Sequence, residues 1–271
     1  MPDIPTYRIG QIVPSSNTTM ETEIPAMMRA RESICPERFT FHSSRMRMHK
    51  VTKEELDAMN KESLRCAAEL ADARVDVMST ACLVAIMAAG FGHHRQTERE
   101  LTEVVRANKC LAPVMTSAGA LIDGLKIMGA RRISLMAPYM RPLTDLVVEY
   151  IEHEGIEVID SICFEMPDNL EVGRRDPMML IEDVQRLNTQ GADVVVASAC
   201  VQMPSLAAIG RIEEKLGIPT ISSAVCTARR MLELLHLRCV VPNAGALLSG
   251  RYPSVTDDSV TPQHSDGLRT A

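Results

Sequence analysis

Residues 193–206 read DVVVASACVQMPSL, and residues 76–90 read DVMSTACLVAIMAAG. Each stretch begins with an aspartate, continues as a short apolar run and reaches small residues and a cysteine. Short apolar runs of this kind are typical of strands that are buried on both faces, as in parallel sheets. A single cysteine in that position is more often packing than chemistry. Two cysteines at matching positions, Cys82 and Cys200, indicate a repeated structural unit.

The repeat extends along the chain. RIGQIVPSSN at residues 8–17 parallels RISLMAPYMR at residues 132–141, and the 118 residues between the two cysteines nearly equal the 124 between Pro14 and Pro138. In both halves, strand patterns alternate with helical patterns of roughly 10–15 residues, which is typical of βαβ units. The sequence therefore predicts an α/β fold: two similar parallel-sheet domains related by pseudo-two-fold symmetry, with an active site in the cleft between them.

The domain boundaries are expected to follow the repeat. We expect a first half over residues 1–130, a second half over 131–224, and a return segment over 225–250 that packs on the first half. Residues 251–271 are polar and poor in apolar side chains, which indicates a tail outside the two cores. Helical patterns cover, among others, residues 20–31, 52–73 and 176–191.

The composition excludes several classes of protein. A hydrophobic share of 46% over 271 residues is ample for a large core, and a net charge of -6 without a basic cluster disfavours nucleic-acid binding. No apolar run approaches the roughly 20 residues that cross a bilayer, and the first ten residues lack a signal-peptide pattern. The eight cysteines lack disulfide-framework or zinc-site spacing. We expect a cytoplasmic protein with free thiols and neither a membrane nor a nucleic-acid partner.

The two repeated cysteines are the candidate catalytic groups. Pseudo-symmetry places the carboxyl ends of both sheets at one cleft, so Cys82 and Cys200 are expected to face each other. A helix is expected to begin directly after each cysteine, and the positive end of its dipole would favour the thiolate. Two thiols in this arrangement can attack, or transfer a proton at, a carbon held between them. The remaining cysteines have no such pairing and are interpreted as structural: Cys35, Cys66, Cys110, Cys163, Cys226 and Cys239.

Polar residues near the predicted cleft point to a carboxylate. The turn PSSNTT at residues 14–19 combines hydroxyls, an amide and backbone N–H groups at a helix N-terminus, a composition that binds anions. Asn17 can hold a carboxylate or cap the helix, and the two roles are compatible. Tyr139 lies in the equivalent turn of the second half, and Asn169 follows a strand as a further donor. The sequence therefore predicts a small carboxylate substrate.

No cofactor or metal is indicated. GFGHHR at residues 90–95 contains closely spaced glycines but lacks the rest of a dinucleotide-binding fingerprint, and no Walker motif occurs. His93 and His94 are adjacent, so their side chains diverge, and we interpret them as loop residues rather than metal ligands.

Four segments carry a family resemblance: RIGQIVPSSNTTMETEIPAM, STACLVAIMAAG, APYMRPLTDLVVEYIEHEGIEV and ASACVQMPSL. They resemble the Asp/Glu racemase superfamily and, within it, the maleate cis–trans isomerases, over nearly the whole chain except the tail. The resemblance implies cofactor-independent isomerisation of maleate to fumarate by a homodimer. It implies that Cys82 adds to the double bond and Cys200 is the partner acid/base, while Asn17, Tyr139 and Asn169 hold the two carboxylates.

Other functions remain open at this stage. An amino-acid or hydantoin-type racemase or epimerase would use the two cysteines as opposed bases. An arylmalonate-type decarboxylase is a further alternative, although such enzymes keep only the second of the two cysteines and this chain has both. A non-catalytic two-lobed binding protein would need neither thiol.

Overall fold

The computed structural model of the protein describes residues 4–48 and 53–253. It contains two four-stranded sheets with the same strand order, β2-β1-β3-β4 and β6-β5-β7-β8, and every strand pair is parallel. The predicted α/β fold of two similar parallel-sheet halves is confirmed. The strands are β1 (Thr6–Pro14), β2 (Arg38–Met46), β3 (Val77–Thr80), β4 (Val114–Thr116), β5 (Arg132–Ala137), β6 (Glu157–Cys163), β7 (Val194–Ser198) and β8 (Thr220–Ser222).

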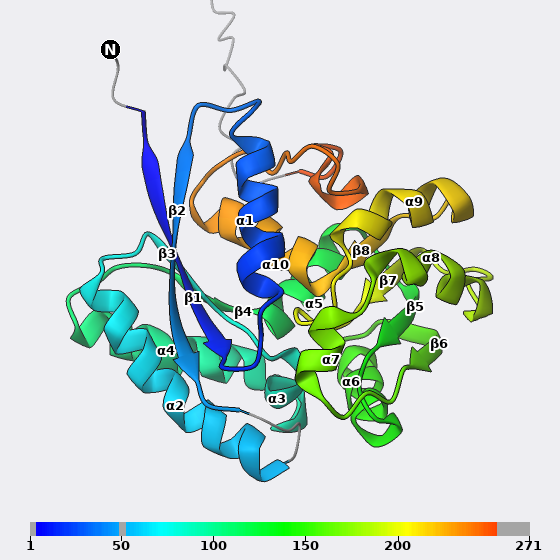
Figure 1. The fold of residues 1–271 in the computed structure, drawn as a ribbon, viewed down its shortest axis with the longest axis horizontal. Helices are drawn as coiled ribbons and strands as arrows, with labels where there is room; N and C mark the ends of the chain where they lie inside the picture. The colour runs from blue at the N-terminus through cyan, green and yellow to red at the C-terminus, as the bar shows by residue number, and fades with distance from the viewer. Residues whose placement is uncertain (1–3, 49–52, 254–271) are drawn as a thin grey trace, which may run out of the picture.

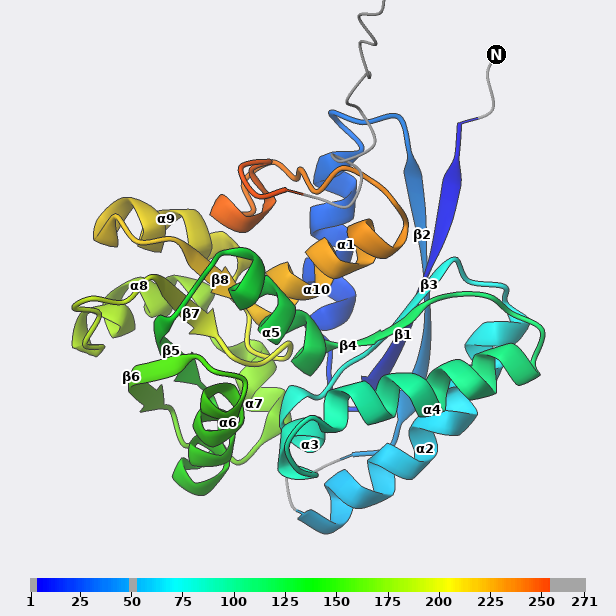
Figure 2. The same ribbon diagram turned by 180° about the vertical axis from the view of Figure 1, so that it is seen from behind.

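Helices surround both sheets (Figures 1 and 2). Those of the first half are α1 (Met20–Arg31), α2 (Lys53–Asp72), α3 (Leu83–Ala88), α4 (His93–Ala107) and α5 (Ser117–Ile127). Those of the second half and the return segment are α6 (Arg141–His153), α7 (Asn169–Arg174), α8 (Leu180–Asp183), α9 (Leu206–Leu216) and α10 (Ser223–Leu234). Three short 3-10 helices are η1 (Pro177–Met179), η2 (Val184–Arg186) and η3 (Ala246–Leu248).

The central strands place the repeated cysteines at equivalent edges. All residues of β3 and β7 are buried, as expected for apolar runs covered on both faces. In the first sheet, Ile12 of β1 pairs with Thr80 of β3, and Thr80 pairs with Thr116 of β4, so the carboxyl ends of these strands meet at one edge. Cys82 lies two residues after the end of β3 in the first sheet. Cys200 lies two residues after the end of β7, the equivalent strand of the second sheet.

Helix α10 connects the end of the second sheet to the first half. It follows β8 directly, yet it packs against α5 and α1, as both ribbon views show (Figures 1 and 2). Gly124 of α5 permits this approach, because a Cβ there would lie 2.7 Å from Cys226 Sγ on α10. The two halves are therefore joined by helix packing as well as by the chain.

Two predicted helices differ from the structure. The pattern at 176–191 forms η1, α8 and η2 instead of one helix. The chain stops being helical before Asn188, whose N–H donates to Asp160 Oδ2 (2.8 Å) and whose carbonyl accepts from Ser134 Oγ (2.6 Å), so it is attached to the sheet. The helix expected directly after Cys200 begins only at Leu206, because Pro204 disfavours a helical conformation at the residue before it.

The interpretation of His93 and His94 as loop residues is wrong. Gly92 adopts a left-handed conformation and α4 begins at His93. His94 is buried, and its Nδ1 hydrogen-bonds the Tyr150 hydroxyl of α6. It therefore helps to join the halves.

Candidate active site

All five predicted site residues line one small enclosed cavity. Cys82 and Cys200 lie beyond β3 and β7, Asn17 and Tyr139 lie beyond β1 and β5, and Asn169 begins α7. The cavity volume is about 20 Å³, which is room for about one water molecule. The lining is completed by Pro14, Met48, Val84, Val201 and Gln202. The fold thus brings together residues that are up to 188 positions apart in the chain, from Pro14 to Gln202.

Cys82 has an unusual backbone. It is the residue before α3 and has φ 73° and ψ 67°, the left-handed region that non-glycine residues rarely adopt. Strained conformations of this kind cluster at functional sites and persist only when the surroundings impose them. Here the buried residues of α3 and strand β3 on either side fix the turn and direct the thiol into the cavity.

Burial, and not the helix end, dominates the electrostatics of Cys82. Loss of solvent raises the pKa of its thiol to about 12, the Ala85 N–H opposes this, and a charge on Cys200 would add to it. The expected stabilisation of the thiolate by a following helix is therefore outweighed by burial at Cys82. It is also absent at Cys200, where α9 begins six residues later.

Cys200 has more hydrogen-bond donors than Cys82. Burial also raises the pKa of the Cys200 thiol, but the Tyr139 hydroxyl and the N–H groups of Gln202 and Met203 lower it. The Gln202 N–H lies 3.4 Å from Cys200 Sγ. If one negative charge is shared between the sulfurs, these donors favour Cys200 as its location.

Tyr139 hydrogen-bonds to the chain near both cysteines. It is 6% exposed, and its hydroxyl donates to the Ala199 carbonyl at 3.1 Å. The same oxygen accepts from the Val84 N–H and is within hydrogen-bond reach of Cys200, so its one hydrogen serves either the Ala199 carbonyl or Cys200. Burial, followed by the nearby Cys200 and Cys82 charges, raises the pKa of the phenol well above its usual value. Tyr139 therefore stays protonated and is a donor for negative charge on Cys200 or on a ligand.

The two asparagines of the cavity come from different halves of the chain. Asn17 Oδ1 accepts from the Met20 N–H (3.1 Å), the first N–H of α1, although the N-cap residue of this helix is Thr19 and not Asn17 as the sequence allowed. Asn169 Nδ2 donates to Ser16 Oγ at 2.8 Å and so connects α7 to the first half. Each amide NH2 group has two hydrogens, so Asn169 has one left for a ligand. Asn17 Nδ2 has no hydrogen-bond partner among residues 4–48 and 53–253, so both of its hydrogens can bind a ligand.

Sequence reasoning missed Gln202. Its side chain is 2% exposed and lines the cavity, two residues after Cys200. The equivalent residue in the first half is Val84, two residues after Cys82, which lines the same cavity. A polar residue opposite an apolar one breaks the internal repeat, and comparing the halves position by position would have found it.

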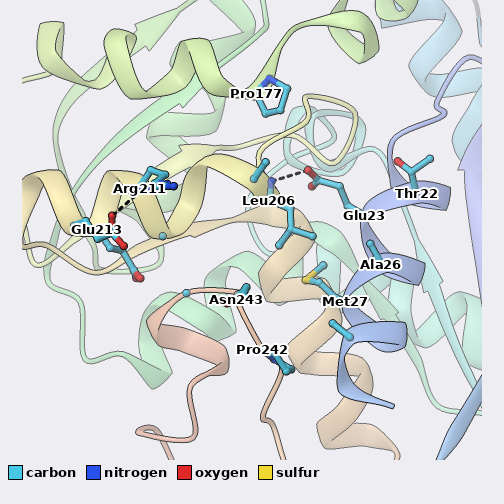
Figure 3. A pocket seen from close by; sticks show the side chains of 15 residues that line it. Thr22, Glu23, Ala26, Met27, Pro177, Leu206, Arg211, Glu213, Pro242 and Asn243 are labelled. Atoms are coloured by element: carbon cyan, nitrogen blue, oxygen red, sulfur yellow. Dashed lines mark hydrogen bonds and ion pairs between the residues drawn. The ribbon is translucent and has the colours of Figure 1, made fainter. Parts of the chain in front are cut away.

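A second, larger depression lies elsewhere. A groove of about 940 Å³ runs between α1 and α9 on the outside of the molecule (Figure 3). Glu23 projects from α1 and accepts from the N–H groups of Ser205 and Leu206, both at 2.6 Å, so its carboxylate caps α9. The groove is open and contains no thiol, so we place the chemistry at the smaller cavity.

The cavity residues suit a reaction of a small anion through sulfur. Two thiols can form a bond to carbon or move a proton, and Tyr139 and the asparagines can bind carboxylate oxygens in surroundings without bulk water. Within residues 4–48 and 53–253, no three His, Cys, Asp or Glu side chains are grouped as a metal site. No helix of this described part is long and apolar enough to cross a membrane.

Comparisons with known proteins identify the family of this chain. Residues 9–248 match the family model described as arylmalonate decarboxylase. The chain is 60% identical over 247 residues to a maleate isomerase of Geobacillus stearothermophilus, covering 91% of this chain and 98% of that protein.

Solved structures of relatives are similar over the same span. The maleate isomerase of Pseudomonas putida S16, in a cysteine-to-alanine variant crystallised with maleate, has a TM-score of 0.90 and 56% identity, covering 91% of this chain and 99% of that one. A cysteine-to-serine variant of Nocardia farcinica maleate cis-trans isomerase, with a covalently bound succinylcysteine intermediate, has a TM-score of 0.86 and 43% identity, covering 90% and 98%. The chain belongs to the maleate isomerase family, within the wider family that the arylmalonate decarboxylase model describes.

Proposed function

We propose that this protein isomerises maleate to fumarate without a cofactor, through reversible addition of the Cys82 thiol to the double bond. The observation that carries the proposal is the convergence of both thiols, Tyr139 and both asparagines on one enclosed cavity. The relatives named maleate isomerase, and the succinylcysteine intermediate in one of them, support the same chemistry.

The reaction balances with the groups present. Cys82 Sγ forms a bond to one alkene carbon while its proton passes to Cys200, and the π electron pair moves onto the adjacent carboxylate as an enediolate. Tyr139, Asn17 and Asn169 donate hydrogen bonds to the carboxylates and stabilise this charge. The former double bond is now single and rotates. The C–S bond then breaks, the double bond re-forms in the trans geometry, and Cys200 returns the proton to Cys82.

The donors around the sulfurs support this division of roles. Cys200 has hydrogen bonds from Tyr139, Gln202 and Met203 that favour its thiolate, whereas Cys82 has one, from Ala85. A charged Cys200 can act as the base that takes the proton of the attacking thiol. Cys82 then becomes nucleophilic only when substrate is present.

The cavity must widen to admit substrate. Its volume of about 20 Å³ accommodates about one water molecule, far less than a dicarboxylate of four carbons. We infer that substrate enters a more open state and reacts in a closed one, which also excludes water from the enediolate.

The test is turnover of maleate followed by absorbance, with no metal or nucleotide added and chelator present. We expect fumarate to accumulate, and a protein that leaves maleate unchanged would contradict the proposal. The same reaction in deuterated water separates it from a racemase. A racemase must incorporate solvent deuterium at carbon, whereas fumarate formed by addition and elimination need not. Obligatory deuterium uptake would contradict the mechanism.

We also propose that the protein is a cytoplasmic homodimer, the state that the family resemblance suggests. All eight cysteines are free, a state that a reducing compartment maintains. Light scattering coupled to gel filtration tests the assembly, with twice the chain mass of 29.8 kDa expected.

A further inference from the structure

The Gln202 side chain uses its full hydrogen-bonding capacity across the cleft. Its Oε1 accepts from the N–H groups of Thr18 (2.9 Å) and Thr19 (3.2 Å). Its Nε2 donates to the carbonyls of Ser16 (3.1 Å) and Asn169 (2.7 Å). A primary amide can make four such bonds, so no capacity is left for substrate. Gln202 is therefore occupied entirely with holding other parts of the protein.

The four bonds fix the residues that are to bind substrate. Ser16 and Thr18 flank Asn17, so the bonds hold the peptide on each side of that asparagine. The bond to the Asn169 carbonyl holds the start of α7, and Asn169 Nδ2 returns to Ser16 Oγ at 2.8 Å. The backbone N–H of Gln202 itself donates to Cys200 Sγ at 3.4 Å. One residue thus couples both asparagines to one sulfur.

Gly173 provides independent support. It lies inside α7 and has no positive φ, so its backbone conformation does not require glycine. Glycine inside a helix is less favourable than alanine, so another reason is needed. A Cβ at Gly173 would lie 2.5 Å from Gln202 Nε2 and 3.2 Å from Thr18 Oγ1. The space that Gly173 leaves is the space that the Gln202 amide occupies.

We propose that Gln202 is a positioning residue that holds Asn17, Asn169 and Cys200 in the reactive arrangement across the two halves, with Gly173 keeping the space for its amide. The inference rests on the proposed isomerase function of the same cavity. Gln202 acts through the residues it holds, and contributes no proton or bond to the reaction.

The chemistry of the amide explains why glutamine is needed. Glutamate would present an oxygen, instead of an NH2 group, to the carbonyls of Ser16 and Asn169. It would also add negative charge beside Cys200 and raise the pKa of that thiol. Methionine keeps the length of the side chain but makes none of the four bonds.

The experiment compares Gln202→Met and Gln202→Glu with the control Gln185→Met, which changes an exposed glutamine of η2. We expect Gln202→Met to lower kcat by on the order of 10²-fold, because small misplacements of binding groups cost this much, while unfolding stays cooperative. Gln202→Glu should also move the pH profile of kcat/KM toward alkaline pH. Gln185→Met should match the wild type in kcat, KM and pH profile.

A double-mutant cycle tests the pairing with Gly173. Gly173→Ala should lower kcat in the wild type, because its Cβ displaces the Gln202 amide, but it should have little further effect in Gln202→Ala, where the space is empty. Additive losses, or kcat of Gln202→Met within threefold of the wild type, would overturn the inference. If the wild type leaves maleate unchanged, the proposed function fails. The alkylation rates of Cys82 and Cys200 by iodoacetamide then test the positioning role: they should rise in Gln202→Met, and unchanged rates would overturn it.

Discussion

At the scale of single residues, the proposed mechanism depends on a few side chains, and only some of them could be identified from the sequence. Cys82 and Cys200 could be predicted because the internal repeat placed them at equivalent strand ends. Asn17, Tyr139 and Asn169 could be selected because polar residues after strands meet at the same edge of a parallel sheet. The left-handed backbone of Cys82 and the four bonds of Gln202 could not be predicted, because both depend on contacts between segments that are far apart in the chain.

The proposed nucleophile gives the first prediction. Cys82→Ala should lower kcat/KM by on the order of 10⁴-fold or more, because alanine has no group that can add to the alkene. Steady-state kinetics with maleate measures the loss. Cys66→Ala is the control, since Cys66 is also a buried cysteine but lies in α2 outside the cavity, and it should retain near-wild-type kcat/KM. Substantial activity in Cys82→Ala would make the assignment wrong.

The hydroxyl of Tyr139 gives a prediction about pH. Tyr139→Phe removes a hydrogen bond that lowers the pKa of Cys200, so this pKa should rise further. A hydrogen bond to a charged group contributes about 1.5 kcal/mol, which corresponds to about one pH unit. The rise of kcat/KM with pH should therefore move about one unit to the alkaline side, with activity partly recovered at high pH. A profile that falls in height without moving would contradict this role.

At the scale of helices and strands, the sequence predicted the order of elements better than their ends. Helix α1 begins and ends where the pattern placed it, and the paired strand runs became the two sheets. The segment at 176–191 differs because its last residues hydrogen-bond to the second sheet through Asn188, a long-range contact that helical periodicity does not encode. The late start of α9 follows from Pro204 and from the Glu23 carboxylate of α1 that caps it.

An ion bridge between helices of the two halves gives a stability prediction. Glu154, directly after the end of α6, pairs with Arg95 of α4 and Lys126 of α5, both at 2.7 Å. The hydrogen bond from Arg95 is the largest cause that lowers the pKa of Glu154, from 4.5 to about 2, and the bond from Lys126 adds to it. Because the pKa is lower in the folded state, the stabilisation is present above pH 4.5 and is lost as the pH falls toward about 2.

Glu154→Gln should lower the free energy of unfolding by about 1 kcal/mol at pH 7, a modest value because Arg95 and Lys126 are half exposed. Urea unfolding at pH 7 and pH 3 measures this. The difference between wild type and variant should shrink at pH 3, and an equal difference at both pH values would contradict the bridge.

At the scale of the whole molecule, the internal repeat is the feature from which the fold could be predicted. Two copies of one sheet order bring equivalent strand ends to a shared cavity, and the packing of α10 on α5 and α1 joins the halves. The size of the cavity could not be predicted, since it depends on how closely the halves approach. Its small volume implies that the two thiols to which we assign the chemistry are shielded from bulk water unless the cavity opens.

Thiol titration tests this shielding. Seven of the eight cysteines are buried and only Cys163 is partly exposed. Ellman's reagent should therefore react quickly with at most one thiol in the native protein and with eight after unfolding. Cys163→Ser should remove the fast phase. A fast phase that persists in this variant and disappears in Cys82→Ser would show that the cavity is open at rest.

The most direct test of the central claim is to trap the covalent intermediate. Protein mixed with excess maleate and quenched in acid within the first turnovers should gain the mass of one maleic acid, because the acid protonates the enediolate carbon before the C–S bond can break. Peptide mapping should place that mass on the peptide that contains Cys82, as a succinyl thioether. Full turnover without any adduct at any time, or an adduct confined to another residue, would contradict the account.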